Sequence, residues 1–314
     1  MKLTGAFLRL VRWPNLVFIV LTQFLFYYCI ILPSFERVDI TSALSWKLFS
    51  WLTISSVLIA AAGYIINDYF DLNIDQVNKP DSIVIQKIIK RRWAIFWHLS
   101  FSFIGVVIAF YVSWRTGSHI IGPANLACVL LLWFYSTSFK KRFLFGNLII
   151  SILTAWVVFV LYLGELNIGR MTQDVAYHQV MVKIFKLAVL YGGFAFIISL
   201  VREVVKDMED IQGDEKYGCR TMPVVWGIPS SKVFAGVWLI VLTLAVVIMQ
   251  VYAVLIGWFG EALFALVLIV VPLVNIFRKL YVAAVNNDFH KISTLIKLVM
   301  LTGILSIMFF RWHF

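Results

Sequence analysis

The sequence predicts an all-α, polytopic membrane protein, and three features of its composition and pattern support that fold class. Hydrophobic residues make up 62% of the 314-residue chain, and charged residues make up only 14%. The mean hydropathy of +0.92 lies well above that of soluble globular domains. Apolar runs of about 17 to 25 residues, the length that crosses a bilayer, recur along the chain. Since no long polar linker separates them, we expect one transmembrane domain over residues 1–314.

Nine apolar runs of this length can be placed in chain order, and counts of eight or ten stay open because one boundary is weakly marked. The first follows Arg9 and Arg12 and lacks the small-residue cleavage site of a signal peptide, so it is predicted to be a retained span. The boundary between the seventh and eighth runs is marked only by Gly257, Gly260 and Glu261. The runs cover residues 15–32, 47–66, 93–113, 119–138, 147–164, 184–202, 233–256, 259–277 and 292–310.

Two longer polar segments interrupt this series, at residues 67–92 and at residues 203–231. We expect short helices in both. In the second segment, Gly213, Gly218 and residues 223–227 are expected to end a helix and turn the chain towards the seventh run.

Lysine and arginine are distributed unevenly between the two predicted sides of the membrane. Most of the 27 basic residues fall on the side of the N-terminus, including those in segments 67–92, 140–142 and 202–232. The positive-inside rule therefore predicts a cytoplasmic N-terminus and, after nine crossings, a C-terminus on the opposite side. Both polar segments then open on the cytoplasmic face.

Several function classes are excluded by composition. The net charge of +11 suggests a nucleic-acid binder, but the basic residues are scattered at the ends of apolar runs, so we expect no nucleic-acid partner. The three cysteines, Cys29, Cys128 and Cys219, form neither a disulfide framework nor a zinc motif. The five histidines are not spaced as metal ligands.

Most of the sixteen acidic residues gather in the two polar segments, and their spacing repeats. Three aspartates at positions i, i+3 and i+7 would share one face of a helix. Carboxylates at the end of an apolar run are costly unless they hold a cation, and oxygen ligands suit magnesium beside substrate phosphates. The two sets are Asp68, Asp71 and Asp75, preceded by Asn67, and Asp207, Asp210 and Asp214. A solvated helix end would explain one such set, but two sets with the same spacing favour a metal site.

These motifs resemble the UbiA superfamily of intramembrane prenyltransferases. The family's first signature is resembled by residues 67–75, together with the following Asn78-Lys79-Pro80-Asp81 and the basic residues 90–92. The second is similar to residues 206–218. Between them and before them, Tyr135-Ser136 with Lys140, Gly146-Asn147, and Arg12 with Asn15 match further family segments, so the resemblance covers nearly the whole chain.

The resemblance implies about nine transmembrane helices around a central cavity, with a cytoplasmic cap formed by the two motif segments. It implies transfer of a prenyl group from an isoprenoid diphosphate to an acceptor, with Mg²⁺ as cofactor. The implied metal ligands are Asn67, Asp68, Asp71, Asp75, Asp207, Asp210 and Asp214, and the implied catalytic residues are Asp71, Asp75, Asp207 and Asp214. The implied substrate contacts are Asn15, Arg12, Lys79, Tyr135, Lys140, Arg202 and Lys206.

Aromatic residues are numerous enough to line a site for an allylic cation. The chain contains 12 Trp, 12 Tyr and 27 Phe residues, whose ring faces attract positive charge. The isoprenoid tail would lie between apolar helices, with an opening to membrane lipid. One departure from the family concerns Ser82, where many relatives carry a phosphate-contacting arginine. Lys79 or Lys87 is expected to substitute for it.

The second motif resembles most closely the branch that adds a geranylgeranyl group to geranylgeranylglyceryl phosphate. A phosphate-bearing acceptor needs an additional basic patch, for which Arg12, Lys141 and Arg142 are candidates. An aromatic acceptor, such as the hydroxybenzoate or dihydroxynaphthoate of quinone biosynthesis, would use the same metal site and stays open. The general base also stays open between Asp75 and Asp214.

Two other protein classes also carry carboxylates within or beside membrane spans. A CDP-alcohol phosphotransferase also pairs carboxylates at a membrane surface, but the glycine, alanine and arginine between its aspartates are absent from this sequence. An ion-coupled membrane transporter places its carboxylates near the bilayer midplane, whereas both acidic sets here lie at the ends of apolar runs.

Overall fold

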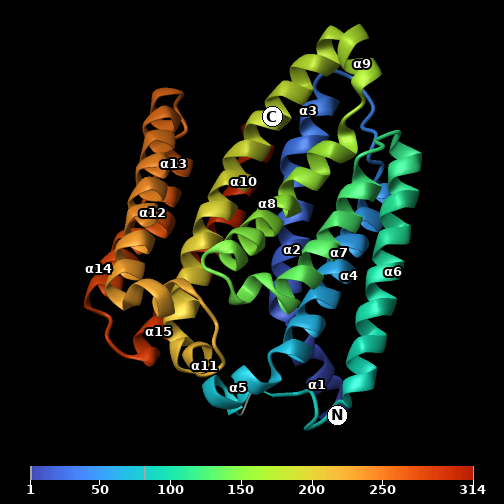
Figure 1. Ribbon diagram of the computed structural model, residues 1–314. Coiled ribbons are helices and arrows are strands. Elements are labelled where there is room, and N and C mark those ends of the chain that lie inside the picture. Colours follow the sequence, from blue (N-terminus) through green and yellow to red (C-terminus); the bar gives the residue numbers. More distant parts are fainter. Residues whose placement is uncertain (1, 81–82, 314) are drawn as a thin grey trace. The chain divides into compact units, whose positions relative to one another are not determined.

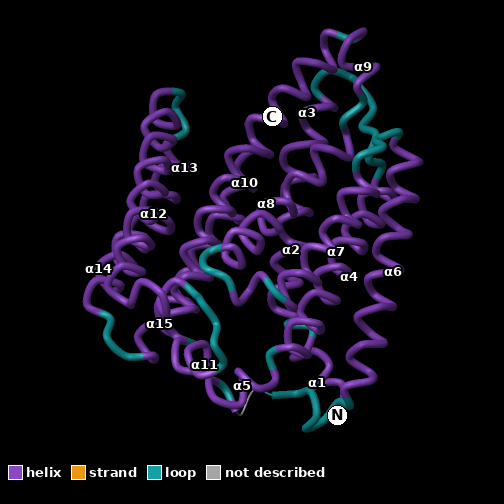
Figure 2. Tube along the Cα trace, viewed as in Figure 1, coloured by secondary structure: helices purple, strands orange, loops and turns teal. Residues whose placement is uncertain are grey.

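The computed structural model describes residues 2–80 and 83–313, and its regular structure over these ranges is helical apart from one isolated bridge between Ile85 and Ile89. Figure 2 shows long helices joined by loops and turns. The predicted departure at Ser82 and the neighbouring Asp81 lie outside the described residues.

The described chain divides into two compact units. The first contains the residues up to Lys140 together with Trp156–Leu190, and the second contains Lys141–Ala155 together with Tyr191–His313. Helices α8 (Phe145–Glu165) and α10 (Val175–Glu209) each contribute residues to both units. The first acidic motif therefore belongs to the first unit, and the second motif belongs to the second unit.

In the first unit, α4 (Trp46–Phe70) packs against α2 (Trp13–Phe26), α6 (Arg91–Thr116) and α7 (Ile121–Thr137), as Figure 1 shows. Gly105 of α6 permits the close approach to α4, because a Cβ atom there would lie 2.9 Å from Ile59. The other helical elements of this unit are α1 (Lys2–Leu10), the π-helical turn η1 (Tyr27–Ile31), α3 (Leu32–Glu36), α5 (Leu72–Asn78) and α9 (Ile168–Gln173).

The first motif rests on an apolar cluster. Buried side chains from α1, α4, α5, the segment 83–89 and the start of α6 form it, including Leu10, Ile65, Leu72 and Ile85. Because residues on either side of the motif are buried in the same cluster, the short helix α5 is fixed beneath the end of α4.

A buried carboxylate fixes the loop between α3 and α4. Glu165, the last residue of α8, has no exposed surface and accepts hydrogen bonds from Ser42 Oγ (2.5 Å), the Ala43 amide (2.8 Å) and the Leu44 amide (3.1 Å). These three donors offset part of the cost of burying the carboxyl group. Sequence reasoning gave no role to Glu165.

The second unit is built around α10, α12 (Met222–Leu255), α14 (Val271–Val282) and α15 (Asn286–Leu305). Gly227 breaks the geometry of α12 with φ 79° and ψ 163°, a conformation that glycine adopts readily. The remaining elements are α11 (Ile211–Lys216), α13 (Phe259–Ala265), η4 (Leu266–Val270), η5 (Ser306–Phe309) and α16 (Phe310–His313).

One face of α10 anchors the second motif. Val201, Val204, Val205 and Met208 have no exposed surface and pack in a core with side chains of α12, α14 and α15. With this face buried, the charged residues of the motif occupy the remaining positions of the helix.

Eight helical segments of the described chain are long and apolar enough to cross a membrane, and α7 is a shorter apolar helix of 17 residues. Together they match the nine apolar runs of the sequence, which confirms the all-α, polytopic prediction. The short helices expected in the two polar segments are α5 and α11. The expected turn between the seventh and eighth runs also occurs, with Gly257 at φ 85°. The protein is an integral, multi-pass membrane protein.

Candidate functional site

The first motif lies where α4 gives way to α5, and Asp71 sits at the junction. Its φ of −86° and ψ of −3° fall in the sparsely populated bridge region, where many active-site residues are found. The hydrogen-bond pattern continues through the break, because the Asp71 amide donates to Asn67 O (3.0 Å) and the Asp75 amide donates to Asp71 O (2.8 Å). The three aspartates therefore follow a nearly helical path, although no single helix carries them.

Asp71 is the most enclosed carboxylate of this motif, with 4% of its surface exposed. Its Oδ2 accepts a hydrogen bond from Asn67 Nδ2 (2.7 Å) and forms an ion pair with Lys140 Nζ. Lys140 comes from the short turn η3 (Phe139–Lys141). Although burial disfavours the ammonium charge, the Asp71 carboxylate outweighs that effect and raises the pKa of Lys140, with a smaller contribution from Tyr135.

Asp68 has a different cation. Arg12 Nη2 donates to Asp68 Oδ1 at 2.7 Å, and the guanidinium carbon lies 5.2 Å from the centroid of the Tyr64 ring. Arg12 has a left-handed backbone (φ 50°, ψ 53°) between α1 and α2, an uncommon conformation for a residue other than glycine. The turn at Arg12 joins the two helices while its side chain reaches the end of α4.

Asp75 of α5 has a raised pKa. Burial and the nearby Asp71 carboxylate raise the pKa of Asp75 to about 6, whereas Lys140 opposes the rise. The first motif therefore crowds three carboxylates around two cations. Burial, together with the neighbouring carboxylates, disfavours the charge on Asp75.

The other predicted substrate contacts of the first unit are partly buried. Asn15 lies in the first turn of α2, and its amide donates to Arg12 O at 2.8 Å. Lys79 ends α5, and Tyr135 lies near the end of α7. Lys87, the expected substitute for an arginine, donates from Nζ to the carbonyl of Pro80 at 2.6 Å.

The second motif repeats the backbone plan of the first. Asp210 lies at the junction of α10 and α11 with φ −96° and ψ 8°. Its amide donates to Lys206 O (2.9 Å), and the Asp214 amide donates to Asp210 O (3.2 Å). Buried Asp214 accepts a hydrogen bond from Thr221 Oγ1 (3.2 Å), and Gly218, at φ 68°, turns the chain after α11 as expected.

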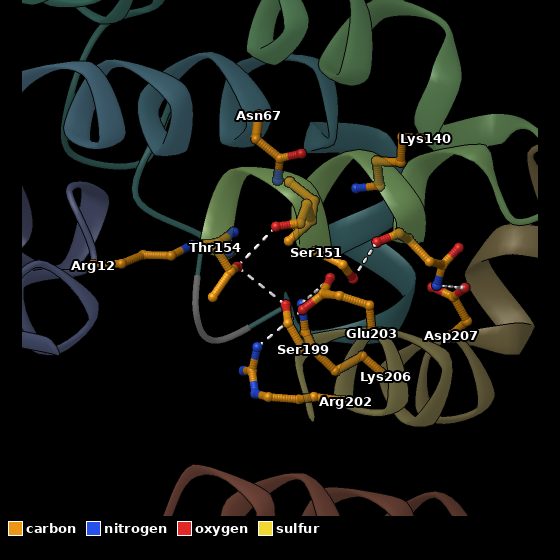
Figure 3. Close-up of polar contacts among 12 residues, drawn as sticks. Arg12, Asn67, Lys140, Ser151, Thr154, Ser199, Arg202, Glu203, Lys206 and Asp207 are labelled. Atoms are coloured by element: carbon orange, nitrogen blue, oxygen red, sulfur yellow. Dashed lines mark hydrogen bonds and ion pairs between the residues drawn. The ribbon is translucent and has the colours of Figure 1, made fainter. Parts of the chain in front are cut away.

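The charges of the second motif are arranged differently. Buried Glu203 holds both predicted phosphate contacts, with Oε1 at 2.9 Å from Arg202 Nη1 and Oε2 at 3.5 Å from Lys206 Nζ. Figure 3 shows these three residues close together on α10. Asp207, one turn further along, accepts a hydrogen bond from Asn147 Nδ2 of α8 at 2.7 Å.

A second polar contact joins α8 and α10 about two helical turns away from the motif. Thr154 and Ser199 lie 3.1 Å apart through their hydroxyl oxygens, as the dashed line in Figure 3 marks. Buried Ser151 donates back to the carbonyl of Asn147 at 2.6 Å. The two helices therefore face each other along a polar stripe with Asp207 and Asn147 at its motif end.

Sequence reasoning missed the roles of Glu203 and Asn147. Glu203 lies four residues before Asp207, so the two side chains lie on the same face of α10. This spacing was a sequence signal that could have indicated a role for Glu203. Asn147 was noted only as part of a family segment, because its contact with Asp207 joins residues 60 positions apart. Both side chains hold a predicted site residue in place.

The described residues of the two motifs include oxygen donors of the kind that bind a divalent cation. They contain no group of three or more His, Cys, Asp or Glu side chains arranged to hold a metal ion alone. Asn67 nevertheless presents a buried Oδ1 that accepts no hydrogen bond from any described residue. Such an oxygen costs about 1–3 kcal/mol when left unpaired. Asn67 and the aspartates are hard oxygen donors of the kind that fit Mg²⁺, which binds through few carboxylates when phosphates complete its shell.

Comparison with known proteins gives a family match over most of the chain. A family described as the UbiA prenyltransferase family matches residues 39–301. That range includes both acidic motifs, Lys140 and Asn147.

Two curated relatives and one solved structure illustrate the similarity. The chain is 27% identical over 252 residues to the digeranylgeranylglyceryl phosphate synthase of Methanosphaera stadtmanae, covering 79% of this chain and 82% of the relative. It is 32% identical over 198 residues to the synthase of the same name from Methanothermobacter thermautotrophicus, covering 62% of this chain and 63% of the relative. A UbiA homolog from Archaeoglobus fulgidus, solved with DMAPP and Mg²⁺, has a TM-score of 0.57 and 16% identity, covering 96% of this chain and 98% of the homolog. This last likeness shows a shared fold.

Proposed function

Because the chain belongs to the UbiA prenyltransferase family, we propose that it transfers a prenyl group from an isoprenoid diphosphate to an acceptor in a magnesium-dependent reaction. The observation that carries the proposal is the pair of acidic motifs, each ending a membrane-length helix beside basic residues. The complex of the Archaeoglobus fulgidus homolog with DMAPP, an isoprenoid diphosphate, and Mg²⁺ supports the choice of donor and cofactor.

For the acceptor we propose geranylgeranylglyceryl phosphate, with geranylgeranyl diphosphate as donor. The names of the curated relatives support this choice, as does the likeness of the second motif to the same branch. The exposed basic residues Lys141, the last residue of η3, and Arg142, which follows it, are candidates for contact with the acceptor phosphate.

Each motif is proposed to supply oxygen ligands to the metal and catalytic carboxylates. Bound magnesium would neutralise diphosphate charge as the C–O bond breaks and so make the diphosphate a better leaving group. The proposed ligands are Asn67, Asp68, Asp71, Asp75, Asp207, Asp210 and Asp214, of which Asp71, Asp75, Asp207 and Asp214 are proposed to be catalytic. The proposed substrate contacts are Asn15, Arg12, Lys79, Tyr135, Lys140, Arg202 and Lys206.

The basic side chains have a separate task from the carboxylates. Phosphate oxygens gain negative charge as the prenyl group departs, and charge-assisted hydrogen bonds from ammonium and guanidinium groups stabilise that charge. Lys140 and Arg12 serve this purpose near the first motif, and Arg202 and Lys206 serve it near the second. Glu203 keeps the latter two cations in place until the phosphate arrives.

Chain order supports a common membrane face for the two motifs. If α6, α7, α8 and α10 each cross the membrane once, the even number of crossings returns the chain to the side on which α4 ended. The excess of lysine and arginine around both motifs supports a cytoplasmic location for that side. We therefore propose a cytoplasmic N-terminus and cytoplasmic motif segments, with the C-terminus on the opposite side.

A product assay tests the proposed substrates. Purified protein is incubated with geranylgeranyl diphosphate, Mg²⁺ and either geranylgeranylglyceryl phosphate or 4-hydroxybenzoate, and the lipid products are identified by mass. A digeranylgeranylglyceryl phosphate product is expected. A product formed only with the aromatic acid would replace the proposed acceptor, and the absence of any prenylated product would refute the function.

A further inference from the structure

The first motif is neutralised by cations of the chain itself. Asp71 pairs with Lys140, which keeps 23% of its side chain exposed, and Asp68 pairs with Arg12. Three aspartates and these two cations leave a single net negative charge. Divalent cations bind more weakly as the charge of their ligand set falls, so a free Mg²⁺ ion finds a poor site here.

Displacement of Lys140 by a metal ion alone would be costly. Breaking an enclosed ion pair by taking away one partner leaves the other charge poorly solvated, which is strongly unfavourable. A free metal ion offers Asp71 a new partner but offers none to the ammonium group. A diphosphate that carries Mg²⁺ offers a partner to both charges. Its oxygens accept hydrogen bonds from Lys140 and Arg12, and the metal binds to the carboxylates.

Asn67 differs from the two cations, because it can stay in place during such an exchange. Its Nδ2 holds Asp71, and its buried Oδ1 accepts no hydrogen bond from the described residues. An amide oxygen adds no charge to the site. It therefore serves as a ligand after the exchange without making the site attractive to free metal beforehand.

We propose that Lys140 and Arg12 are internal counterions that weaken the binding of free Mg²⁺ to the first motif. The metal then binds together with the donor diphosphate. The two cations then transfer from aspartates to phosphate oxygens. This inference rests on the proposed function, and it adds an order of binding and a second role for Lys140.

Titration calorimetry on the purified full-length protein in detergent tests the proposal. The probes are Mg²⁺ alone and Mg²⁺ in the presence of geranylgeranyl thiolodiphosphate, an unreactive donor analogue. For the wild-type protein we expect Mg²⁺ alone to bind at least about tenfold more weakly than with the analogue, a difference of about 1.4 kcal/mol. Equal affinity for Mg²⁺ with and without the analogue would overturn the proposal.

The Lys140→Met variant removes the proposed counterion. We expect its affinity for Mg²⁺ alone to rise at least about tenfold, because Asp71 then needs a new cation, and its affinity for the analogue to fall. Lys47→Met, which removes an exposed lysine at the start of α4, is the matched control and is expected to leave both affinities unchanged. A folded Lys140→Met protein with unchanged Mg²⁺ affinity would contradict the counterion role.

These measurements distinguish a failure of the proposed function from a failure of the counterion role. If wild-type protein binds neither Mg²⁺ with the analogue nor the analogue itself, the proposed function fails. If the analogue binds with Mg²⁺ and the metal also binds tightly alone, the function stands and the counterion role fails. Should Lys140→Met not fold, the wild-type comparison decides the question without it.

Discussion

The two acidic motifs share a backbone plan but differ in how their charges are balanced. In each, the middle aspartate, Asp71 or Asp210, sits in the bridge region at a junction of two helices. In the first motif, the partners of the carboxylates are cations from distant parts of the chain, 56 and 69 residues away. In the second, the cations Arg202 and Lys206 sit beside Glu203 on the same helix.

This difference in charge partners means that the two motifs keep their charged side chains in place in different ways before a phosphate binds. The first motif holds its proposed metal ligands against cations, so both charges are released together when a metal and a phosphate arrive. The second motif holds its cations with Glu203, which is not among the proposed ligands, and it leaves Asp207 with the neutral amide of Asn147. We therefore expect changes in the first motif to alter the coupling of metal and phosphate, and changes around Glu203 to alter phosphate binding.

The largest effects are expected from a carboxylate of each motif. Asp71→Asn and Asp207→Asn should each reduce kcat/KM for prenyl transfer by at least about 100-fold, because losing a charged metal ligand removes several kcal/mol of transition-state stabilisation. Steady-state kinetics with geranylgeranyl diphosphate measures this. Asp39→Asn, at an exposed turn after α3, is the control and should leave the rate unchanged. Near-normal turnover by either motif variant would remove that residue from the site.

The second prediction concerns Glu203, which forms ion pairs with Arg202 and Lys206 in the second motif. Glu203→Gln should raise KM for the donor about tenfold, or about 1.4 kcal/mol, and change kcat less, because Arg202 and Lys206 lose the partner that positions them. Glu203→Asp should recover part of the effect. Glu215→Gln, an exposed change on α11, serves as the control. A fall in kcat at constant KM would instead assign Glu203 to the chemical step.

A smaller effect is expected from the amide that holds Asp207. Asn147→Leu should raise the Mg²⁺ concentration for half-maximal rate by about tenfold, since residues that orient a metal ligand typically contribute 10- to 100-fold to affinity or activity. Ser151→Ala, one turn along α8, is the matched change and should have little effect on the Mg²⁺ requirement. Equal Mg²⁺ dependence of the two variants would show that the Asn147 contact does not orient Asp207.

The smallest of these effects is the change in thermal stability expected on removing the ion pair between Arg12 and Asp68. This ion pair is partly exposed, with 36% and 23% of the two side chains accessible. Exposed pairs typically contribute less than about 1 kcal/mol, so Arg12→Gln should lower thermal stability only slightly. Thermal denaturation of the purified protein measures this. A loss of stability as large as that of a core substitution would mean that Arg12 holds the α1–α2 turn as well as Asp68.

The sequence predicted most of the fold because membrane spans are a local property of the chain. A run of about 20 apolar residues in a bilayer must satisfy its backbone hydrogen bonds within itself, so length and hydropathy suffice. The runs at 184–202 and 233–256 were placed correctly, although the helices that contain them, α10 and α12, are longer. Helix α10 extends beyond its apolar run at both ends, and α12 begins before its run, at Met222, with a kink at Gly227.

The candidate site was predictable only in part, because its contacts are not local. Spacing made the aspartates candidates, and the family resemblance made the lysines and arginines candidates. Nothing in the sequence pairs Lys140 with Asp71 or Asn147 with Asp207, since those contacts depend on how the helices pack. The helix breaks at Asp71 and Asp210 also lack a glycine or proline to mark them.

The most direct test of the account is release of inorganic pyrophosphate from geranylgeranyl diphosphate by the purified protein, with and without Mg²⁺ and with geranylgeranylglyceryl phosphate as acceptor. The account predicts release that requires Mg²⁺, is accelerated by the acceptor and equals the amount of prenylated product. Release that is unaffected by removal of Mg²⁺, or no release from a folded protein, would contradict it.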